Sequence, residues 1–133
     1  GYGASLNGRR IRVSGRTEEA GALYATGIPF SAPSFNEMDK YLASMHEFAN
    51  NSAGIRRLGV ASLDLAYVAA GRMDVFWEMS LKPWDIAAGV LIVREAGGMV
   101  SDFNGGEKFM DSGHILACTP SAPVGIPRSI NRW

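Results

Sequence analysis

The sequence predicts an α/β fold with a largely parallel sheet. Segments rich in branched and aromatic residues alternate along the chain with segments whose apolar residues recur at helical spacing. Such alternation is typical of layered structures in which helices cover a sheet. The chain has 133 residues, 47% of them apolar and 20% charged, which suits a single globular domain.

The first sixteen residues, 1–16, are expected to form a β-hairpin. Residues 4–6 and 9–13 flank Asn7-Gly8, a strong signal for a two-residue turn. A lone hairpin is only marginally stable in water. The chain also opens on Gly1-Tyr2-Gly3 without an initiator Met. We therefore expect that it has been cut from a longer protein, and that the hairpin belongs to a missing amino-terminal domain.

Residues 17–120 are expected to form a carboxyl-terminal α/β domain. A loop with one polar helical turn, at 14–21, leads into it. Its strands are expected at 22–26, 54–58, 73–79, 99–102 and 114–118.

Three helices are expected between these strands. Ser34 and Glu37 form a capping box, and an apolar stripe follows (Phe35, Met38, Tyr41, Leu42, Met45, Phe48 and Ala49). Ser62 is expected to cap a second helix that buries Leu63, Ala66, Tyr67 and Ala70. Pro83 suits the first turn of the third helix and Gly97 its end. Trp77 and Trp84 are expected in the core.

Composition also bears on partners and location. Thirteen basic residues balance thirteen acidic ones, so no nucleic-acid partner is expected. The longest apolar run, 86–93, is far short of the ~20 residues that span a bilayer, and no membrane partner is expected. Cys118 is the only cysteine and no signal peptide is apparent, which fits a cytoplasmic location. The prolines of 121–133 predict an irregular tail.

Three segments are expected to meet at one edge of the sheet. In open α/β sheets, ligands bind beyond the carboxyl ends of the strands. Residues 59–61 (Gly59, Val60 and Ala61) join a strand to a helix, Glu78 closes a strand, and Asp85 opens the next helix. Each has a structural alternative. Asp85 can serve the helix start or hold a divalent cation, Glu78 can be a solvated charge, and Gly59 can supply backbone freedom alone.

Other chemistries lack their motifs. The sequence contains no glycine-rich dinucleotide or Walker-type loop and no paired-cysteine or His-x-x-x-His metal motif. It also lacks the Gly-x-Ser-x-Gly elbow of α/β-hydrolases.

The segment Trp84–Gly98 resembles the carboxyl-terminal signature of the inositol monophosphatase family of magnesium-dependent phosphomonoesterases. The resemblance runs from Gly3 to about Pro120. It implies a layered α/β/α domain with a mixed, mostly parallel sheet. It also implies that Asp85 is a catalytic residue that binds Mg²⁺, and that Glu78 bonds a hydroxyl of a polyol substrate. Gly59, Val60 and Ala61 would line the same polyol through backbone groups, and the enzyme would be a homodimer.

The chain lacks the family's other signature, Asp-Pro-x-Asp-Gly-Thr, and therefore resembles only the carboxyl-terminal half. The expected partners are the missing amino-terminal half and a small-molecule phosphate monoester of inositol or a similar polyol. Without that half we expect no activity, because Mg²⁺ needs six oxygen ligands. Two alternatives stay open: a non-catalytic polyol- or nucleotide-binding module, or a phosphatase for histidinol phosphate, fructose bisphosphate or nucleotide bisphosphates.

Two smaller departures concern single segments. Val60 stands where many family members carry Ser or Thr, so a side-chain hydroxyl is absent there. The proline-rich tail replaces the final helix that is usual in the family.

Overall fold

The computed structural model describes residues 1–30 and 35–120, and a five-stranded sheet lies at its centre. Its strands are β3 (Leu23–Thr26), β4 (Gly54–Arg56), β5 (Val75–Glu78), β6 (Met99–Ser101) and β7 (Ile115–Cys118). They lie side by side in the order β4-β3-β5-β7-β6. β3 is parallel to β4 and β5, whereas β7 is antiparallel to both of its neighbours. Four strands therefore point one way, and the predicted mixed, mostly parallel sheet is confirmed.

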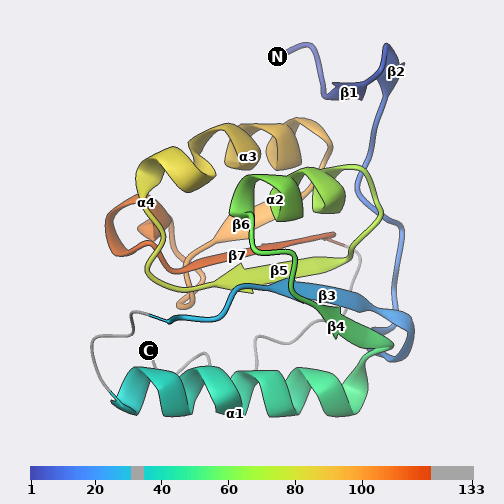
Figure 1. Ribbon diagram of the computed structural model, residues 1–133. Helices are drawn as coiled ribbons and strands as arrows, with labels where there is room; N and C mark the ends of the chain where they lie inside the picture. Colours follow the sequence, from blue (N-terminus) through green and yellow to red (C-terminus); the bar gives the residue numbers. More distant parts are fainter. Residues whose placement is uncertain (31–34, 121–133) are drawn as a thin grey trace.

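Helices cover both faces of this sheet. α1 (Phe35–Asn51) lies along one face, and α2 (Ala61–Ala69) and α3 (Pro83–Glu95) lie together on the other (Figure 1). A short helix, α4 (Phe109–Ser112), precedes β7 and was not expected from the sequence. The predicted α/β/α layering is confirmed, with α2 and α3 beginning at the same end of the sheet (Figure 1).

The core is divided by the sheet into two clusters, because successive strand residues point to opposite faces. On the face that packs against α2 and α3, the sheet contributes Ala25, Phe76, Ile115 and Ala117 to the core. Toward α1 it contributes Tyr24, Val75, Trp77 and Leu116. Trp77 is buried, as predicted, and its ring centroid lies 4.6 Å from that of Phe48.

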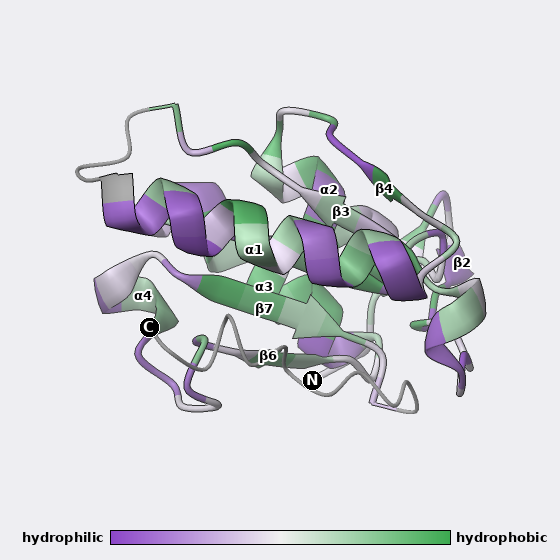
Figure 2. Cartoon of the chain, turned by 90° about the horizontal axis from the view of Figure 1, so that it is seen from below, coloured by the Kyte–Doolittle hydropathy of each residue, from purple (hydrophilic) through white to green (hydrophobic). Residues whose placement is uncertain are grey.

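The long helix α1 is amphipathic, with hydrophilic residues along its outer side (Figure 2). Tyr41 and Phe48 are buried against the sheet, and Met38 and Met45 pack beside them. The outer part of the predicted stripe, Leu42 and Ala49, is exposed. Ser34, the expected cap, lies outside the described residues.

The start and the buried face of α2 were predicted wrongly. The helix begins at Ala61 after Val60, not after Ser62. Leu63, from the expected face, is exposed, whereas the helix buries Asp64, Leu65, Val68 and Ala69. The polar Asp64 interrupts the apolar spacing of the true buried face, so the sequence pattern favoured the neighbouring stripe.

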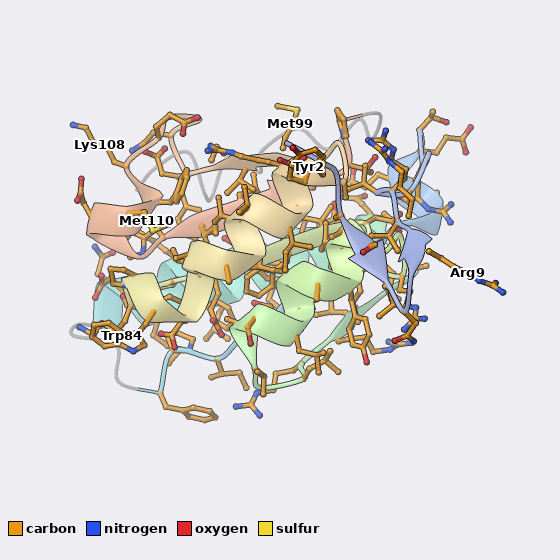
Figure 3. The ribbon with its side chains drawn as sticks, turned by 90° about the horizontal axis from the view of Figure 1, so that it is seen from above. Tyr2, Arg9, Trp84, Met99, Lys108 and Met110 are labelled. Carbon is orange, nitrogen blue, oxygen red and sulfur yellow. The ribbon has the colours of Figure 1, made fainter. Side chains whose placement is uncertain are left out.

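A close contact joins α2 to α3. A Cβ added to Gly89 would lie 2.5 Å from Cδ1 of Leu65, so only a glycine allows the two helices to approach this closely. Trp84, which was expected in the core, is 79% exposed and projects from the start of α3 (Figure 3). It lies in the first turn of the helix.

The expected hairpin forms a separate two-stranded sheet of β1 (Ser5–Leu6) and β2 (Arg9–Arg10), apart from the main sheet (Figure 1). Asn7 and Gly8 both have positive φ, at 52° and 77°, as a tight hairpin turn requires. A single 3-10 turn, η1 (Glu19–Gly21), occupies the predicted loop. The predicted tail, 121–133, lies outside the described residues. Within the described ranges no helix is both long and apolar enough to span a bilayer.

A buried carboxylate attaches the segment after the hairpin to the sheet. Asp74 precedes β5 and accepts hydrogen bonds from the Leu23 backbone N–H, at 2.7 Å, and from the Ser14 hydroxyl. The Arg16 guanidinium lies 3.2 Å from the same carboxylate. The Thr119 hydroxyl in turn donates to the Ser14 carbonyl. Asp74 thus joins β3, β5 and the linker at one point.

We predict that Asp74→Ala lowers the free energy of unfolding by about 2–3 kcal/mol, because it leaves the part-buried Leu23 N–H and the Arg16 guanidinium without their acceptor. Urea unfolding of this chain measures the change. Asp39→Ala, at an exposed position of α1, is the control and should change stability by less than about 0.5 kcal/mol. Equal effects of the two substitutions would contradict the role given to Asp74.

Candidate functional site

A pocket of about 290 Å³ opens where three parallel strands end. Its lining consists of Gly59, Val60, Ala61, Ser62, Glu78, Leu81, Trp84 and Asp85. β4, β3 and β5 are neighbours and run in the same direction, so their carboxyl ends meet at this edge. All five residues that the sequence singled out therefore line one pocket. The structure brings them together but does not test their roles.

Glu78 is the last residue of β5 and is half-buried in the pocket wall. Its carboxyl group occupies the space that a side chain at Gly27 would fill. A Cβ added to Gly27 would lie only 1.1 Å from Oε1 of Glu78. Oε2 of Glu78 is buried and has no hydrogen-bond partner among the described residues. The glycine after β3 thus creates the space for this carboxyl group on the neighbouring strand.

Asp85 lies in the first turn of α3 and accepts a hydrogen bond from the Lys82 backbone N–H through Oδ2, at 2.9 Å. This interaction satisfies one of the unpaired N–H groups at the helix start. The sequence left two roles open for Asp85, and the helix-start role is observed. The side chain also lines the pocket beside Glu78, so a ligand of the pocket can reach it.

The loop between Glu78 and Asp85 is held by the residues before β7. The Ser80 N–H donates to Nδ1 of His114, at 3.2 Å, and the Leu81 N–H donates to the Gly113 carbonyl, at 3.0 Å. Burial lowers the pKa of His114, which favours the neutral ring that Nδ1 needs in order to accept. A Cβ on Gly113 would lie 2.2 Å from the Leu81 carbonyl oxygen. This packing fixes the pocket side of the loop.

Residues 59–61 form the opposite wall. Gly59 has a φ of +86°, a left-handed conformation that favours glycine. Val60 is the N-cap of α2 and provides no side-chain acceptor for the first N–H groups of the helix. The start of α2 therefore presents backbone donors toward the pocket, where a ligand oxygen can accept from them.

A third carboxyl group, which the sequence analysis missed, lies behind this wall. Asp64 is in the first turn of α2 and is only 1% exposed. Within the described ranges, neither of its carboxyl oxygens has a hydrogen-bond partner. An acidic residue within an otherwise apolar helix was a possible sequence signal for it. Gly27 was also missed as a site residue, because its effect depends on the pairing of β3 with β5.

Burial and like charges disfavour ionisation of the two inner carboxyl groups. Burial raises the pKa of Asp64 from 3.8 to about 6, with the Arg57 charge acting in the opposite direction. Burial, followed by the charges of Asp64 and Asp85, raises the pKa of Glu78 from 4.5 to about 7. Arg57 opposes this shift as well. Glu78 in the pocket wall and the buried Asp64 therefore hold their protons to a higher pH than carboxyl groups usually do.

The described residues do not complete a metal site. They contain no group of three or more His, Cys, Asp or Glu side chains that could hold a metal ion. Mg²⁺ prefers six oxygen ligands in octahedral geometry, often one or two of them carboxylates and the rest water or phosphate oxygens. Asp85 can supply one ligand from this chain, and other protein ligands would have to come from elsewhere.

The sequence matches the inositol monophosphatase family over residues 1–129. The chain belongs to this family. Among curated relatives, the Nus factor SuhB of Pseudomonas aeruginosa is 57% identical over 117 residues, which are 88% of this chain and 43% of that protein. The Nus factor SuhB of Escherichia coli (strain K12) is 51% identical over 120 residues, 90% of this chain and 44% of that protein. The chain thus spans less than half the length of these relatives.

Solved structures of the family have the same fold. The inositol monophosphatase from Anabaena (Nostoc) sp. PCC 7120 superposes with a TM-score of 0.89 at 35% identity, covering 99% of this chain and 53% of that one. The extragenic suppressor protein suhB from Bartonella henselae gives a TM-score of 0.85 at 44% identity, covering 98% and 47%. The resemblance on which the sequence analysis relied is therefore confirmed, and the partial coverage agrees with the expectation of a carboxyl-terminal half.

We predict that Asp64 makes stability fall as the pH rises from about 4 to 7. Its pKa is higher in the folded state, so between 3.8 and about 6 the folded protein keeps a proton that the unfolded chain has lost. The contribution is complete below pH 4 and is lost as pH rises through the folded pKa. Each unit of difference in pKa corresponds to about 1.4 kcal/mol.

Urea unfolding of wild type and Asp64→Asn at several pH values measures this contribution. We compare the free energy of unfolding of wild type with that of Asp64→Asn. The difference between the two should decrease by about 1–3 kcal/mol as the pH rises from 4 to 7. Asp39→Asn, an exposed position on α1, is the matched control. A pH-independent difference for Asp64→Asn would contradict the prediction.

Proposed function

We propose that this chain is the substrate-side part of a magnesium-dependent phosphatase that hydrolyses phosphate monoesters of inositol or a similar polyol. Membership of the inositol monophosphatase family supports the reaction class. The observation that carries the proposal is the pocket in which Gly59, Val60, Ala61, Glu78 and Asp85 meet. Residues 59–61 offer backbone hydrogen-bond donors, Glu78 offers an acceptor for a ligand hydroxyl, and Asp85 offers a carboxylate oxygen for a cation.

Each residue has a proposed task that its chemistry can perform. Glu78 accepts a hydrogen bond from a polyol hydroxyl, and residues 59–61 donate backbone N–H groups to the same polyol. Asp85 contributes an oxygen ligand to Mg²⁺, which when bound lowers the pKa of a water and neutralises phosphate charge. The Oδ2 bond to the Lys82 N–H orients the Asp85 carboxylate in the pocket wall. Asp85 is therefore expected to keep its position before a ligand binds.

The remaining ligands and the attacking water are expected on the part of the protein that this chain lacks. The chain spans 43% of the Pseudomonas aeruginosa relative, and its described residues offer no complete metal cluster. We therefore propose that the chain alone is inactive and requires the amino-terminal half. A homodimer of the whole protein, a cytoplasmic location and the assignment of the hairpin at 1–16 to the amino-terminal domain also remain predictions.

A second candidate is a non-catalytic role. It is favoured by the names of the relatives, because the proteins from Pseudomonas aeruginosa and Escherichia coli are called Nus factors rather than phosphatases. The same pocket would then bind a polyol or nucleotide without hydrolysing it. Phosphate release by a protein that contains both halves distinguishes the two candidates.

The first functional prediction concerns Asp85. We define the joined protein as the Nus factor SuhB of Pseudomonas aeruginosa with its corresponding residues replaced by this chain. It should release phosphate from myo-inositol 1-phosphate only with Mg²⁺, whereas this chain alone should not. Asp85→Asn should lower kcat by about 10²–10³-fold, because an amide is a poor ligand for the cation.

The amide oxygen that this substitution introduces can still accept from the Lys82 N–H, so thermal stability should change little. Asp111→Asn, an exposed carboxylate in α4, is the control and should keep full activity. Near-normal turnover by Asp85→Asn would limit Asp85 to the helix start. Activity of this chain alone would contradict its proposed dependence on the other half.

The second functional prediction concerns Glu78. In the joined protein, Glu78→Gln should raise KM for myo-inositol 1-phosphate by about 5–10-fold, because a charge-assisted hydrogen bond to a hydroxyl is weakened. KM for p-nitrophenyl phosphate, which has no such hydroxyl, should stay unchanged. Steady-state kinetics with both substrates measure this selectivity. A parallel change in both KM values would argue against a contact between Glu78 and the polyol.

A further inference from the structure

Ser80, in the loop between Glu78 and Asp85, has a backbone conformation that its neighbours must maintain. Its φ is +56°, in the left-handed region that favours glycine. The other non-glycine residue with a positive φ in the described ranges is Asn7, whose conformation the hairpin turn explains. Ser80 instead lies between a strand and a helix. Non-glycine residues in this region persist where surrounding groups hold them, and they concentrate at functional sites.

The loop that contains Ser80 shapes two cavities. Glu78 and Leu81 line the pocket that contains Asp85, and both also line a second pocket of about 260 Å³. Ser80 itself contributes to the second pocket. The conformation of this loop therefore determines the form of both cavities.

The ring of His114 holds Ser80 from the segment before β7. Its Nδ1 accepts a hydrogen bond from the Ser80 N–H at 3.2 Å. Ser80 is exposed, so water can satisfy the same N–H, and the bond to His114 adds little to the stability of the fold. Its main effect is therefore to fix the direction of this N–H, and with it the left-handed conformation of Ser80.

The orientation of the His114 ring is also fixed. Phe103 is 2% exposed, and its ring is stacked on that of His114, with centroids 5.3 Å apart and planes 7° apart. Asp102, the residue before Phe103, accepts hydrogen bonds from three backbone N–H groups within 104–108 and so holds the turn in place. Contacts thus run from the connection between β6 and β7, through His114, to the loop of the pocket.

We propose that His114 is a positioning residue for substrate recognition. It lines neither pocket, so it acts through the loop: by holding Ser80 it keeps Leu81 in place in the pocket wall. The hydrogen bond from the Leu81 N–H to the Gly113 carbonyl, at 3.0 Å, acts beside it. The identity of the substrate rests on the proposed function, whereas the dependence of the loop on His114 does not.

Two substitutions separate the acceptor from the ring. His114→Phe keeps a ring that can stack on Phe103 but removes the acceptor. His114→Asn removes the ring but introduces an amide oxygen that can accept from the Ser80 N–H in place of Nδ1. The chain contains one other histidine, His46, at an exposed position of α1, and His46→Phe is the matched control.

Amide hydrogen exchange of this chain, followed by nuclear magnetic resonance, tests the loop without any activity. In His114→Phe the amides of Ser80 and Leu81 should exchange about 3–10-fold faster, because the loop opens more often, whereas that of Phe76 within β5 should not change. His114→Asn should stay within about twofold of wild type, and His46→Phe should match wild type. Unchanged exchange at Leu81 in His114→Phe, or equal acceleration in His114→Asn, would overturn the positioning role.

Kinetics of the joined protein test the consequence for recognition. His114→Phe should raise KM for myo-inositol 1-phosphate by about 3–10-fold with kcat within about twofold, because the pocket wall shifts while Asp85 keeps its own bond at the start of α3. His114→Asn should restore KM to within about twofold of wild type. A wild-type KM in His114→Phe, or the same rise in His114→Asn, would contradict the proposal. Absence of phosphate release by the wild-type joined protein would count against the proposed function alone, and the exchange experiment would still decide the role of His114.

Discussion

The parallel pairing of β3 with both β4 and β5 is the constraint on which the site depends. Because these strands run in one direction, the residues that follow them leave the sheet at one edge, and α2 and α3 both begin there. Backbone donors and carboxylates far apart in sequence therefore meet without a long loop. The antiparallel strand β7 completes the arrangement, because the residues before it hold the loop that joins Glu78 to Asp85.

Carboxyl groups near the two ends of β5 affect stability in opposite ways. Asp74, at the other end of β5, is buried with three partners and stabilises the fold, as a satisfied carboxylate should. Asp64 is buried and Glu78 is half-buried, and both have buried oxygens without partners in the described residues and raised pKa values, which is unfavourable for folding. Carboxyl groups with raised pKa values and unpartnered oxygens concentrate at ligand-binding sites, because the ligand supplies the missing hydrogen-bond partner. The contrast between the two ends of one strand supports a binding role for the pocket.

Residues at the ends of elements were easier to predict than residues within them. Glu78, Asp85 and residues 59–61 each lie at a strand end or a helix start, where glycine, proline and polar residues give local signals, and all of them line the pocket. Asp64 and Trp84 were misjudged, because the burial of a side chain depends on which face of a helix meets the sheet. The buried Asp64 on α2 and the exposed Trp84 on α3 both depart from the usual pattern. Family resemblance, rather than spacing, gave the proposed roles.

The distribution of ligands explains how the described part of the chain can have a well-formed pocket without a complete metal site. Recognition of a polyol needs only directed donors and acceptors, and one α/β layer can position those with its own strands and helices. A divalent cation needs several hard oxygens in a fixed geometry, and Asp85 is a single one. Asp85 already bonds the start of α3, so its orientation does not depend on the cation. Under the proposed function, a site divided in this way would let one half present the substrate while the other supplies the water and most of the charge, and neither half would hydrolyse the ester alone.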